Sequence, residues 1–245
     1  MRRVNAAALL LAASASIAAC AGEPEGEQRI KEIIDDLVAR EYTRATSRYR
    51  MFEAEILAPA ASPSWRRATD HSDETVREWA VDALWRIGLE SDIDVVRARL
   101  DDPVRGVRMM AVDGLIQMAP EEAAAEFKLR LSGDAPEQVT LAASGLADMQ
   151  DRTALPLLIE RFQDPSLPES TRAALTQPMA VLGTAVVVAP LVDAALNSGL
   201  GTELRRLAAE AAFAAEAEGV GDMLMRLLDA DDEYVRALAD SMIER

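Results

Sequence analysis

A motif that returns at a fixed interval constrains this chain more than any other feature of its sequence. Val76-Arg77 is followed 31 residues later by Val107-Arg108. Two further sets keep this spacing of 31 residues: Ala80, Ala111 and Ala142, and Leu84, Leu115 and Leu146. Repetition of one amphipathic unit is typical of stacked helical hairpins, because no such unit can bury its apolar face alone. The period therefore predicts a helical solenoid.

The composition favours the same architecture. Apolar residues make up 50% of the 245 residues, but aromatic residues make up only 4%. Small alanine side chains carry much of the apolar share, and they suit closely packed helices better than a sheet. We expect an all-α fold, a right-handed α-solenoid of helical hairpins with an N-terminal helical cap.

Residues 1–19 have the pattern of an export signal. Arg2 and Arg3 form a positively charged start, and residues 6–13 form an apolar segment too short to span a bilayer. The sequence Ile17-Ala18-Ala19-Cys20 follows. It resembles the bacterial lipobox, and this resemblance implies cleavage before Cys20 and lipidation of its sulfur. An ordinary cleavable signal and a soluble secreted product remain the alternative.

The segment after the cysteine predicts where the body of the protein is held. Residues 20–27 are short, polar and rich in helix breakers, so we expect a lipidated Cys20 and a tether. Enteric lipoproteins with an Asp directly after the cysteine are retained in the inner membrane, but Ala21 stands here. The resemblance therefore favours a lipid-anchored protein in the cell envelope, at the outer membrane and facing the periplasm.

Cysteine usage and charge limit the stabilising bonds and the partners. Cys20 is the only cysteine, so no internal disulfide can form. The formal net charge is −16, and removal of residues 1–19 takes away two arginines and no acidic residue. Such a surface disfavours nucleic acid and anionic lipid headgroups. It favours another protein with a basic segment as partner.

The chain divides into a cap and a repeat region. Residues 28–67 predict a cap: an amphipathic helix from Gln28 to Ala45, then a second helix that ends before Pro59. Residues 68–245 predict about five hairpins. Their recurring features are an arginine near the start of the second helix, a large apolar residue near the end of the first, and a proline in its first turn. The arginines are Arg77, Arg108, Arg172, Arg205 and Arg236, with Thr140 in the third unit; the apolar residues are Leu100, Leu131, Phe162 and Leu196; the prolines are Pro120, Pro156 and Pro190.

These positions together resemble HEAT-like repeats of the phycobilisome-lyase type. The resemblance is carried by Leu155-Pro156-Leu157-Leu158, Phe162, Asp164-Pro165, Asp102-Pro103, Val107-Arg108 and Gly114-Leu115. It implies that the recurring arginines pair with turn aspartates and form a structural ladder. It implies little about function, because repeats of this kind serve as scaffolds, as chaperone adaptors and, rarely, as bilin lyases.

Few residues are candidates for chemistry or recognition. Trp65 lies outside the repeat motif in a stretch containing proline and serine, so it is the candidate for a surface residue that binds a partner. Trp79 and Trp85 align with apolar residues one period on and are expected in the core. His71, the only histidine, is expected in an exposed loop or cap, and the acidic run 229–233 is expected to cap a helix.

The sequence contains no convincing catalytic pair and no zinc, calcium or nucleotide motif. We expect no enzyme activity, cofactor or metal. The favoured function is a membrane-anchored scaffold that binds another protein in the bacterial envelope. A lyase or isomerase related to chromophore-attaching proteins is one alternative, and a structural envelope component without a discrete partner is the other.

Overall fold

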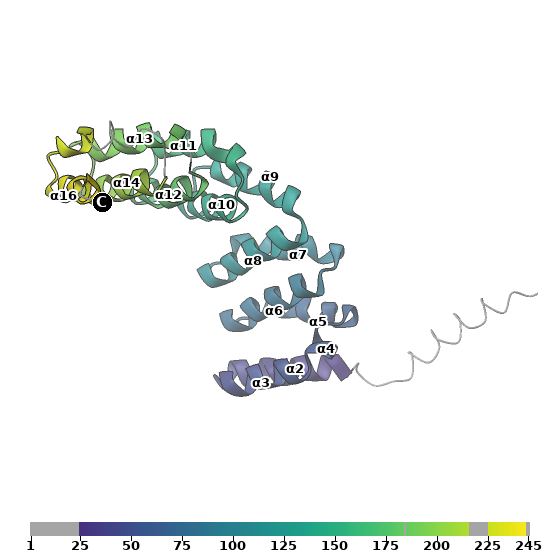
Figure 1. Cartoon of the computed structure of the whole chain (residues 1–245). Helices are drawn as coiled ribbons and strands as arrows, with labels where there is room; N and C mark the ends of the chain where they lie inside the picture. Colours follow the sequence, from purple (N-terminus) through teal and green to yellow (C-terminus); the bar gives the residue numbers. More distant parts are fainter. Residues whose placement is uncertain (1–24, 184, 216–224, 244–245) are drawn as a thin grey trace, which may run out of the picture. The chain divides into compact units, whose positions relative to one another are not determined.

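The computed structural model describes residues 25–183, 185–215 and 225–243 (Figure 1). All regular elements in these ranges are α-helices or short 3-10 helices, so the predicted all-α fold class is confirmed. The predicted signal peptide, Cys20 and the first part of the tether lie outside the described residues. The chain divides into two compact units, residues 1–114 (unit 1) and residues 115–245 (unit 2).

Unit 1 consists of successive helical hairpins, which lie in successive rows (Figure 1). Helix α2 packs on α3, and α5 packs on α6. Helix α8 is shared between the units, and its residues up to Gly114 belong to unit 1. The elements are α2 (Glu25–Val38), α3 (Tyr42–Met51), α4 (Glu53–Ile56), η1 (Pro59–Ala61), α5 (Ser62–Ala68), α6 (Glu74–Ile87), η2 (Glu90–Asp92), α7 (Ile93–Ala98), η3 (Arg99–Asp101) and α8 (Arg105–Met118).

Unit 2 repeats the hairpin plan in two rows of helices. The first helices of the hairpins, α9, α11 and α13, contact one another in one row, and the second helices, α10, α12, α14 and α16, form the other (Figure 1). The elements are α9 (Pro120–Leu131), α10 (Pro136–Asp148), η4 (Arg152–Ala154), α11 (Leu155–Gln163), α12 (Glu169–Leu182), α13 (Ala185–Leu196), α14 (Thr202–Ala214) and α16 (Glu233–Ile243). A helical turn covers residues 225–228.

The residues of the 31-residue period occupy the core. All six alanines and leucines of the two spaced sets are at most 1% exposed, as are Val76 and Val107. Their common burial follows from the repeat, because equivalent residues of stacked hairpins face equivalent neighbours.

Aspartates in the turns cap the second helices. Asp73 accepts a hydrogen bond from the Thr75 amide at 2.9 Å, and Asp102 accepts one from the Val104 amide at 2.9 Å. Such contacts satisfy amides that have no partner within the helix. In the acidic run 229–233, Asp232 accepts hydrogen bonds from the Tyr234 and Val235 amides, so the predicted capping role of this run is confirmed.

Two helix boundaries differ from the prediction. The expected helix from Gln28 to Ala45 is interrupted, because α2 ends at Val38 and Arg40 takes the left-handed conformation with a φ of 62°. The Arg40 and Glu41 amides bond back to Leu37 and Asp36 carbonyls, which is the arrangement of a Schellman turn. An apolar stripe that continues across such a turn gives no sign of the break.

Pro190 is the second difference. It was expected in the first turn of its helix, as Pro120 and Pro156 are in theirs, but α13 already begins at Ala185. The apolar residues before Pro190 extend the helix, so the proline lies inside it.

None of the described helices is both long enough and apolar enough to cross a membrane.

Candidate functional site

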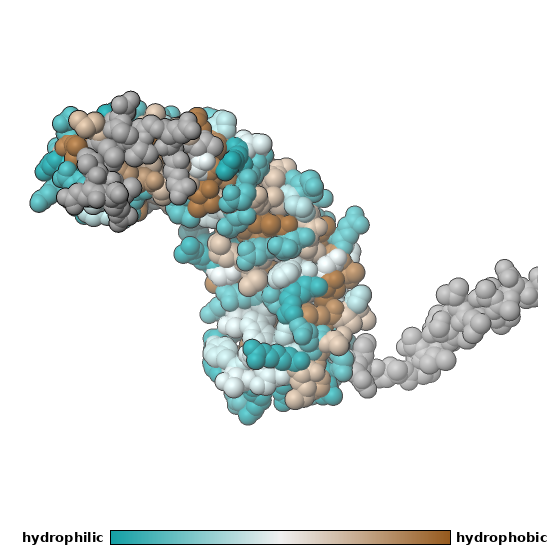
Figure 2. Space-filling model, viewed as in Figure 1, coloured by the Kyte–Doolittle hydropathy of each residue, from teal (hydrophilic) through white to brown (hydrophobic). Residues whose placement is uncertain are grey.

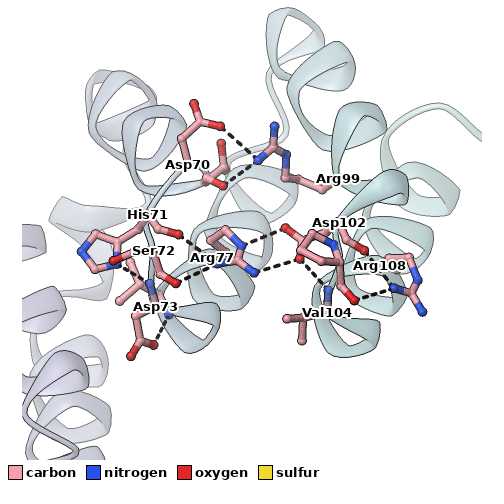
Figure 3. A network of polar contacts seen from close by, with 12 residues as sticks. Asp70, His71, Ser72, Asp73, Arg77, Arg99, Asp102, Val104 and Arg108 are labelled. Carbon is pink, nitrogen blue, oxygen red and sulfur yellow. Dashed lines mark hydrogen bonds and ion pairs between the residues drawn. The ribbon is translucent and has the colours of Figure 1, made fainter.

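One of the recurring arginines, Arg77, joins the turns of two neighbouring hairpins. In unit 1, Arg77 donates through Nε and Nη2 to both carboxylate oxygens of Asp102, at 2.8 and 2.9 Å, and through Nη1 to the His71 and Ser72 carbonyls (Figure 3). Arg108 in turn donates to the carbonyl of Asp102 at 2.8 Å. The guanidinium of Arg77 therefore ties the turn before its own helix to the turn of the next hairpin.

The Arg77–Asp102 pair is buried, and its surroundings favour the charged state. Burial alone would raise the pKa of Asp102, but the Arg77 hydrogen bonds, the Val104 amide and the charge of Arg77 hold this pKa below its usual range. Asp102 therefore remains ionised at neutral pH. A bidentate, partnered pair of this kind fixes the angle between two hairpins.

The other ladder positions use different partners. Arg205 donates to the Ala195 carbonyl at 3.0 Å and also contacts the carboxylate of Asp231 in the next hairpin. Arg172 donates to the Phe162 carbonyl at 2.7 Å and lies over the Phe162 ring. Arg236 donates to the carbonyl of Ala230. Each of these contacts satisfies a carbonyl at or after the end of the preceding helix.

Trp65 is not a surface residue. It lies in α5, its side chain is 0% exposed, and its indole Nε1 donates to the Ile56 carbonyl at 2.7 Å. The prediction of an exposed Trp65 is wrong, because the stretch containing Pro63 forms a helix instead of a loop and turns the ring inward. A partner cannot reach this side chain in the folded unit.

Trp79 on α6 is one of the aromatic residues of unit 1 that remain partly accessible. Trp79 is half-buried, as is Trp85, so neither is enclosed in the core as predicted. The Tyr49 ring of α3 packs against Trp79 at right angles, with 5.3 Å between ring centroids. This edge-to-face contact holds the indole in place. Hydrophilic and hydrophobic side chains are interspersed over the face of unit 1 that is visible in Figure 2.

Trp79 and Tyr49 line an open pocket of about 500 Å³ in unit 1. The pocket lies on the second helices of the hairpins, α3, α6 and α8, with Glu53 of α4 at one side. Its aromatic walls and its several charged groups give it the mixture of apolar and polar surface that is usual in binding sites. The lining residues are Thr46, Tyr49, Arg50, Glu53, Glu78, Trp79, Asp82, Arg86 and Met110.

Most charges in the pocket are paired with one another. Arg86 contacts the carboxylate of Glu53, lies 3.7 Å from Asp82 and donates to the Tyr49 hydroxyl at 3.1 Å. The Tyr49 hydroxyl donates to Asp82 at 3.2 Å. Burial and the negative charge of Asp82 raise the pKa of Tyr49, so its hydroxyl stays protonated and remains a donor.

Glu78 is the carboxylate of the pocket that is not paired in this way. Among the described residues it has neither a hydrogen-bond nor an ion-pair partner, although it lines the pocket. Burial and the nearby charge of Glu74 raise the pKa of Glu78. A Cβ on Gly106 of α8 would lie 1.8 Å from Oε1 of Glu78, so the carboxylate rests directly against the α8 backbone. Glu78 is therefore a partly desolvated acid that lines the pocket.

Tyr49, Glu78 and Asp82 are not among the functional residues predicted from the sequence. A signal was available, because Glu74, Glu78 and Asp82 recur every four residues and so share one face of α6. His71 accepts a hydrogen bond from the Asp73 amide at 3.0 Å and lies outside this pocket. In the part of the chain that the structure describes, no three His, Cys, Asp or Glu residues are grouped as metal ligands.

The comparison with protein families agrees with the repeat architecture over part of the chain. The family model for HEAT repeats matches residues 54–116, from α4 to α8. Similar solved structures include a chain of the complex of CpcE and CpcF of phycocyanin lyase from Nostoc sp. PCC7120, with 19% identity, a TM-score of 0.43, and coverage of 73% of this chain and 74% of that one. No curated protein matches the chain. The family match identifies HEAT repeats in residues 54–116, a segment that consists of successive short helices.

Proposed function

We propose that this protein is a HEAT-repeat lipoprotein of the bacterial cell envelope and a scaffold that binds another protein through unit 1. The observation that carries the proposal is the open pocket on α3, α6 and α8, with an aromatic wall and several carboxylates. The second helices of stacked hairpins present a surface that is free to bind, because the core needs only the opposite faces.

The charge of the chain supports a basic protein segment as the partner. The net charge of −16 opposes binding to a polyphosphate backbone. Glu53, Glu78 and Asp82 contribute three carboxylates to the pocket, against Arg50 and Arg86. A basic segment would gain from both the local and the overall charge, and its binding would weaken as salt screens these interactions.

Membrane attachment is supported by the sequence at the N-terminus. The resemblance of residues 17–20 to a lipobox assigns the anchor to Cys20, and an outer-membrane position facing the periplasm follows from the residue after it. A multiply acylated cysteine holds a protein stably at a bilayer, whereas one chain holds it only reversibly. Metabolic labelling with a clickable fatty acid tests this part: wild type should be labelled and Cys20→Ser should not.

Photo-crosslinking in cells tests the scaffold. A photoreactive phenylalanine derivative replaces Thr46, which lines the pocket without contributing a charge. The matched control carries the same derivative at Leu129, which is 68% exposed on α9 of unit 2. We expect a discrete adduct from position 46 and none of that size from position 129. The same adducts from both positions, or none from position 46, would refute binding through this pocket.

A further inference from the structure

We infer that the pocket of unit 1 takes one cationic side chain, an arginine or lysine of the partner's basic segment, between the Trp79 ring and the Glu78 carboxylate. This inference rests on the proposed function, since a partner protein must supply the segment. Trp79 and Glu78 are the two side chains that would contact the partner's cation. They are distinct from the pocket charges that serve the fold.

Two of the three carboxylates in the pocket already have partners within it. Arg86 contacts Glu53 and approaches Asp82, and Asp82 also accepts the Tyr49 hydroxyl. These two carboxylates are therefore already engaged. Glu78 is not, and Arg50, on the exposed side of α3, forms no ion pair with it. The carboxylate left to meet an incoming cation is that of Glu78.

The two aromatic rings of the pocket differ in whether a cation already lies over them. The guanidinium of Arg86 lies over Tyr49, 5.4 Å from the ring centroid, so this ring already has its cation. Trp79 is held edge-on by the same tyrosine, lines the pocket and has no cation over it among the described residues. Tryptophan binds cations more strongly than the other aromatic residues.

The protein forms the same arrangement of ring, cation and carboxylate elsewhere from its own residues. Arg86 lies over Tyr49 and contacts Glu53. Likewise Arg29 lies over Phe52 and 3.9 Å from Glu55, and Arg206 lies over Tyr234 and 3.7 Å from Asp232. In each case one guanidinium joins an aromatic ring to a carboxylate. Trp79 and Glu78 supply the ring and the carboxylate of such a group without the cation.

The burial of Glu78 fits this arrangement. Its raised pKa reflects the loss of water around the carboxylate and the charge of Glu74 beside it. A bound cation would offset both effects. Charge-assisted hydrogen bonds to a partly desolvated carboxylate are stronger than those on an open surface. The Glu78 carboxylate lies against Gly106 of α8, at the edge of the pocket.

Peptide titrations test the inference on the detergent-solubilised full chain. One probe is acetyl-Gly-Gly-Arg-Gly-Gly-amide, and the other carries citrulline, which has the shape of arginine without its charge. Tryptophan fluorescence reports binding, because all three tryptophans lie in unit 1. We expect the arginine peptide to bind at least about fivefold more tightly than the citrulline peptide at low salt.

Two isosteric variants test whether the preference for the arginine peptide comes from Glu78. Glu78→Gln should reduce the difference between the peptides, whereas Glu90→Gln, an equal change of charge at an exposed site outside the pocket, should preserve it. Equal binding of both peptides to wild type, or an unchanged preference in Glu78→Gln, would overturn the inference. If the photoreactive residue at position 46 nevertheless gives a discrete adduct in cells, the scaffold proposal stands and only the cationic occupant is rejected.

Discussion

Units 1 and 2 share a hairpin plan, but different side chains stabilise them. Unit 1 contains all three tryptophans, and its hairpins are joined by buried ion pairs: Asp102 bonds to Arg77, and Asp92, which is 0% exposed, bonds to Ser62 and Arg66. In unit 2 the helix contacts are lined by small residues. The buried alanines there include Ala142, Ala143, Ala147, Ala194, Ala195, Ala208, Ala209, Ala211 and Ala212.

The difference shows which property a repeat must keep and which it can change. Each hairpin must bury the apolar face of its helices, and both units do so at equivalent positions. The way in which neighbouring turns are joined can vary: a guanidinium meets a buried carboxylate at Arg77, but a carbonyl and a ring at Arg172. The aromatic and charged pocket belongs to the unit that uses large rings and ion pairs.

The largest effect is expected from removing a ring of unit 1. Trp65→Ala leaves a cavity at a fully buried site and removes the donor to the Ile56 carbonyl, which should cost about 4 kcal/mol. Thermal unfolding followed by the fluorescence of Trp79 and Trp85 should show a much lower midpoint. Trp65→Phe is the control and should lose clearly less. A change below about 1 kcal/mol would contradict the burial of this ring.

The second prediction concerns the Arg77–Asp102 ion pair of unit 1. Asp102→Asn leaves Arg77 without a buried counter-charge and should cost about 3 kcal/mol at neutral pH. Arg172→Met in unit 2 loses a carbonyl contact and a ring contact, and should cost less. Urea denaturation, read by tryptophan fluorescence for unit 1 and by circular dichroism for both units, compares them. Equal losses would break the proposed difference between the units.

The pH dependence follows from the lowered pKa of Asp102. Because the folded-state pKa lies below the unfolded value, the stabilisation by this group is complete above the unfolded pKa and is lost as pH falls through the folded one. The gap between wild type and Asp102→Asn should therefore be widest at pH 5 to 7 and shrink below about pH 4. A gap that is constant from pH 7 to pH 2 would refute a role for the ionised carboxylate.

A smaller effect is expected where unit 2 depends on a missing side chain. A Cβ on Gly145 would lie 2.7 Å from the fully buried ring of Phe127, so Gly145→Ala should cost about 1–2 kcal/mol despite its gain in helix propensity. Adding Phe127→Leu should relieve the clash, so the two changes should be non-additive. Circular dichroism melts of both single variants and the double variant measure this coupling, and simple additivity would contradict the packing.

The smallest effect is expected at a turn of unit 2. Gln150 follows α10 with a φ of 55°, and its amide and that of Asp151 bond back to the helix end. Glycine adopts this conformation without the Cβ penalty, so Gln150→Gly should stabilise the chain by about 0.5 kcal/mol. The midpoint should rise by circular dichroism but not by tryptophan fluorescence if the units unfold separately. A lower midpoint would show that the Gln150 side chain matters more than its backbone.

Much of the fold was predictable from the sequence, and less of the site. The period placed Ala80, Leu84 and their equivalents in the core, because stacking gives equivalent residues equivalent neighbours. Trp65 was misassigned because a local stretch with proline and serine reads as a loop, although distant residues enclose it. Glu78 could be placed on a face of α6, but its lack of a partner depends on contacts with other helices.

The sequence by itself determined the all-α class, the hairpin repeat and the positions of the buried alanines and leucines. These follow from the helical spacing of apolar residues within each hairpin and from its recurrence in the next hairpins. Only the tertiary structure decided which carboxylate each arginine meets, which tryptophan remains accessible and which acid of α6 is left unpaired. Side chains from helices far apart in the sequence meet at these points, and their distances depend on how the hairpins pack.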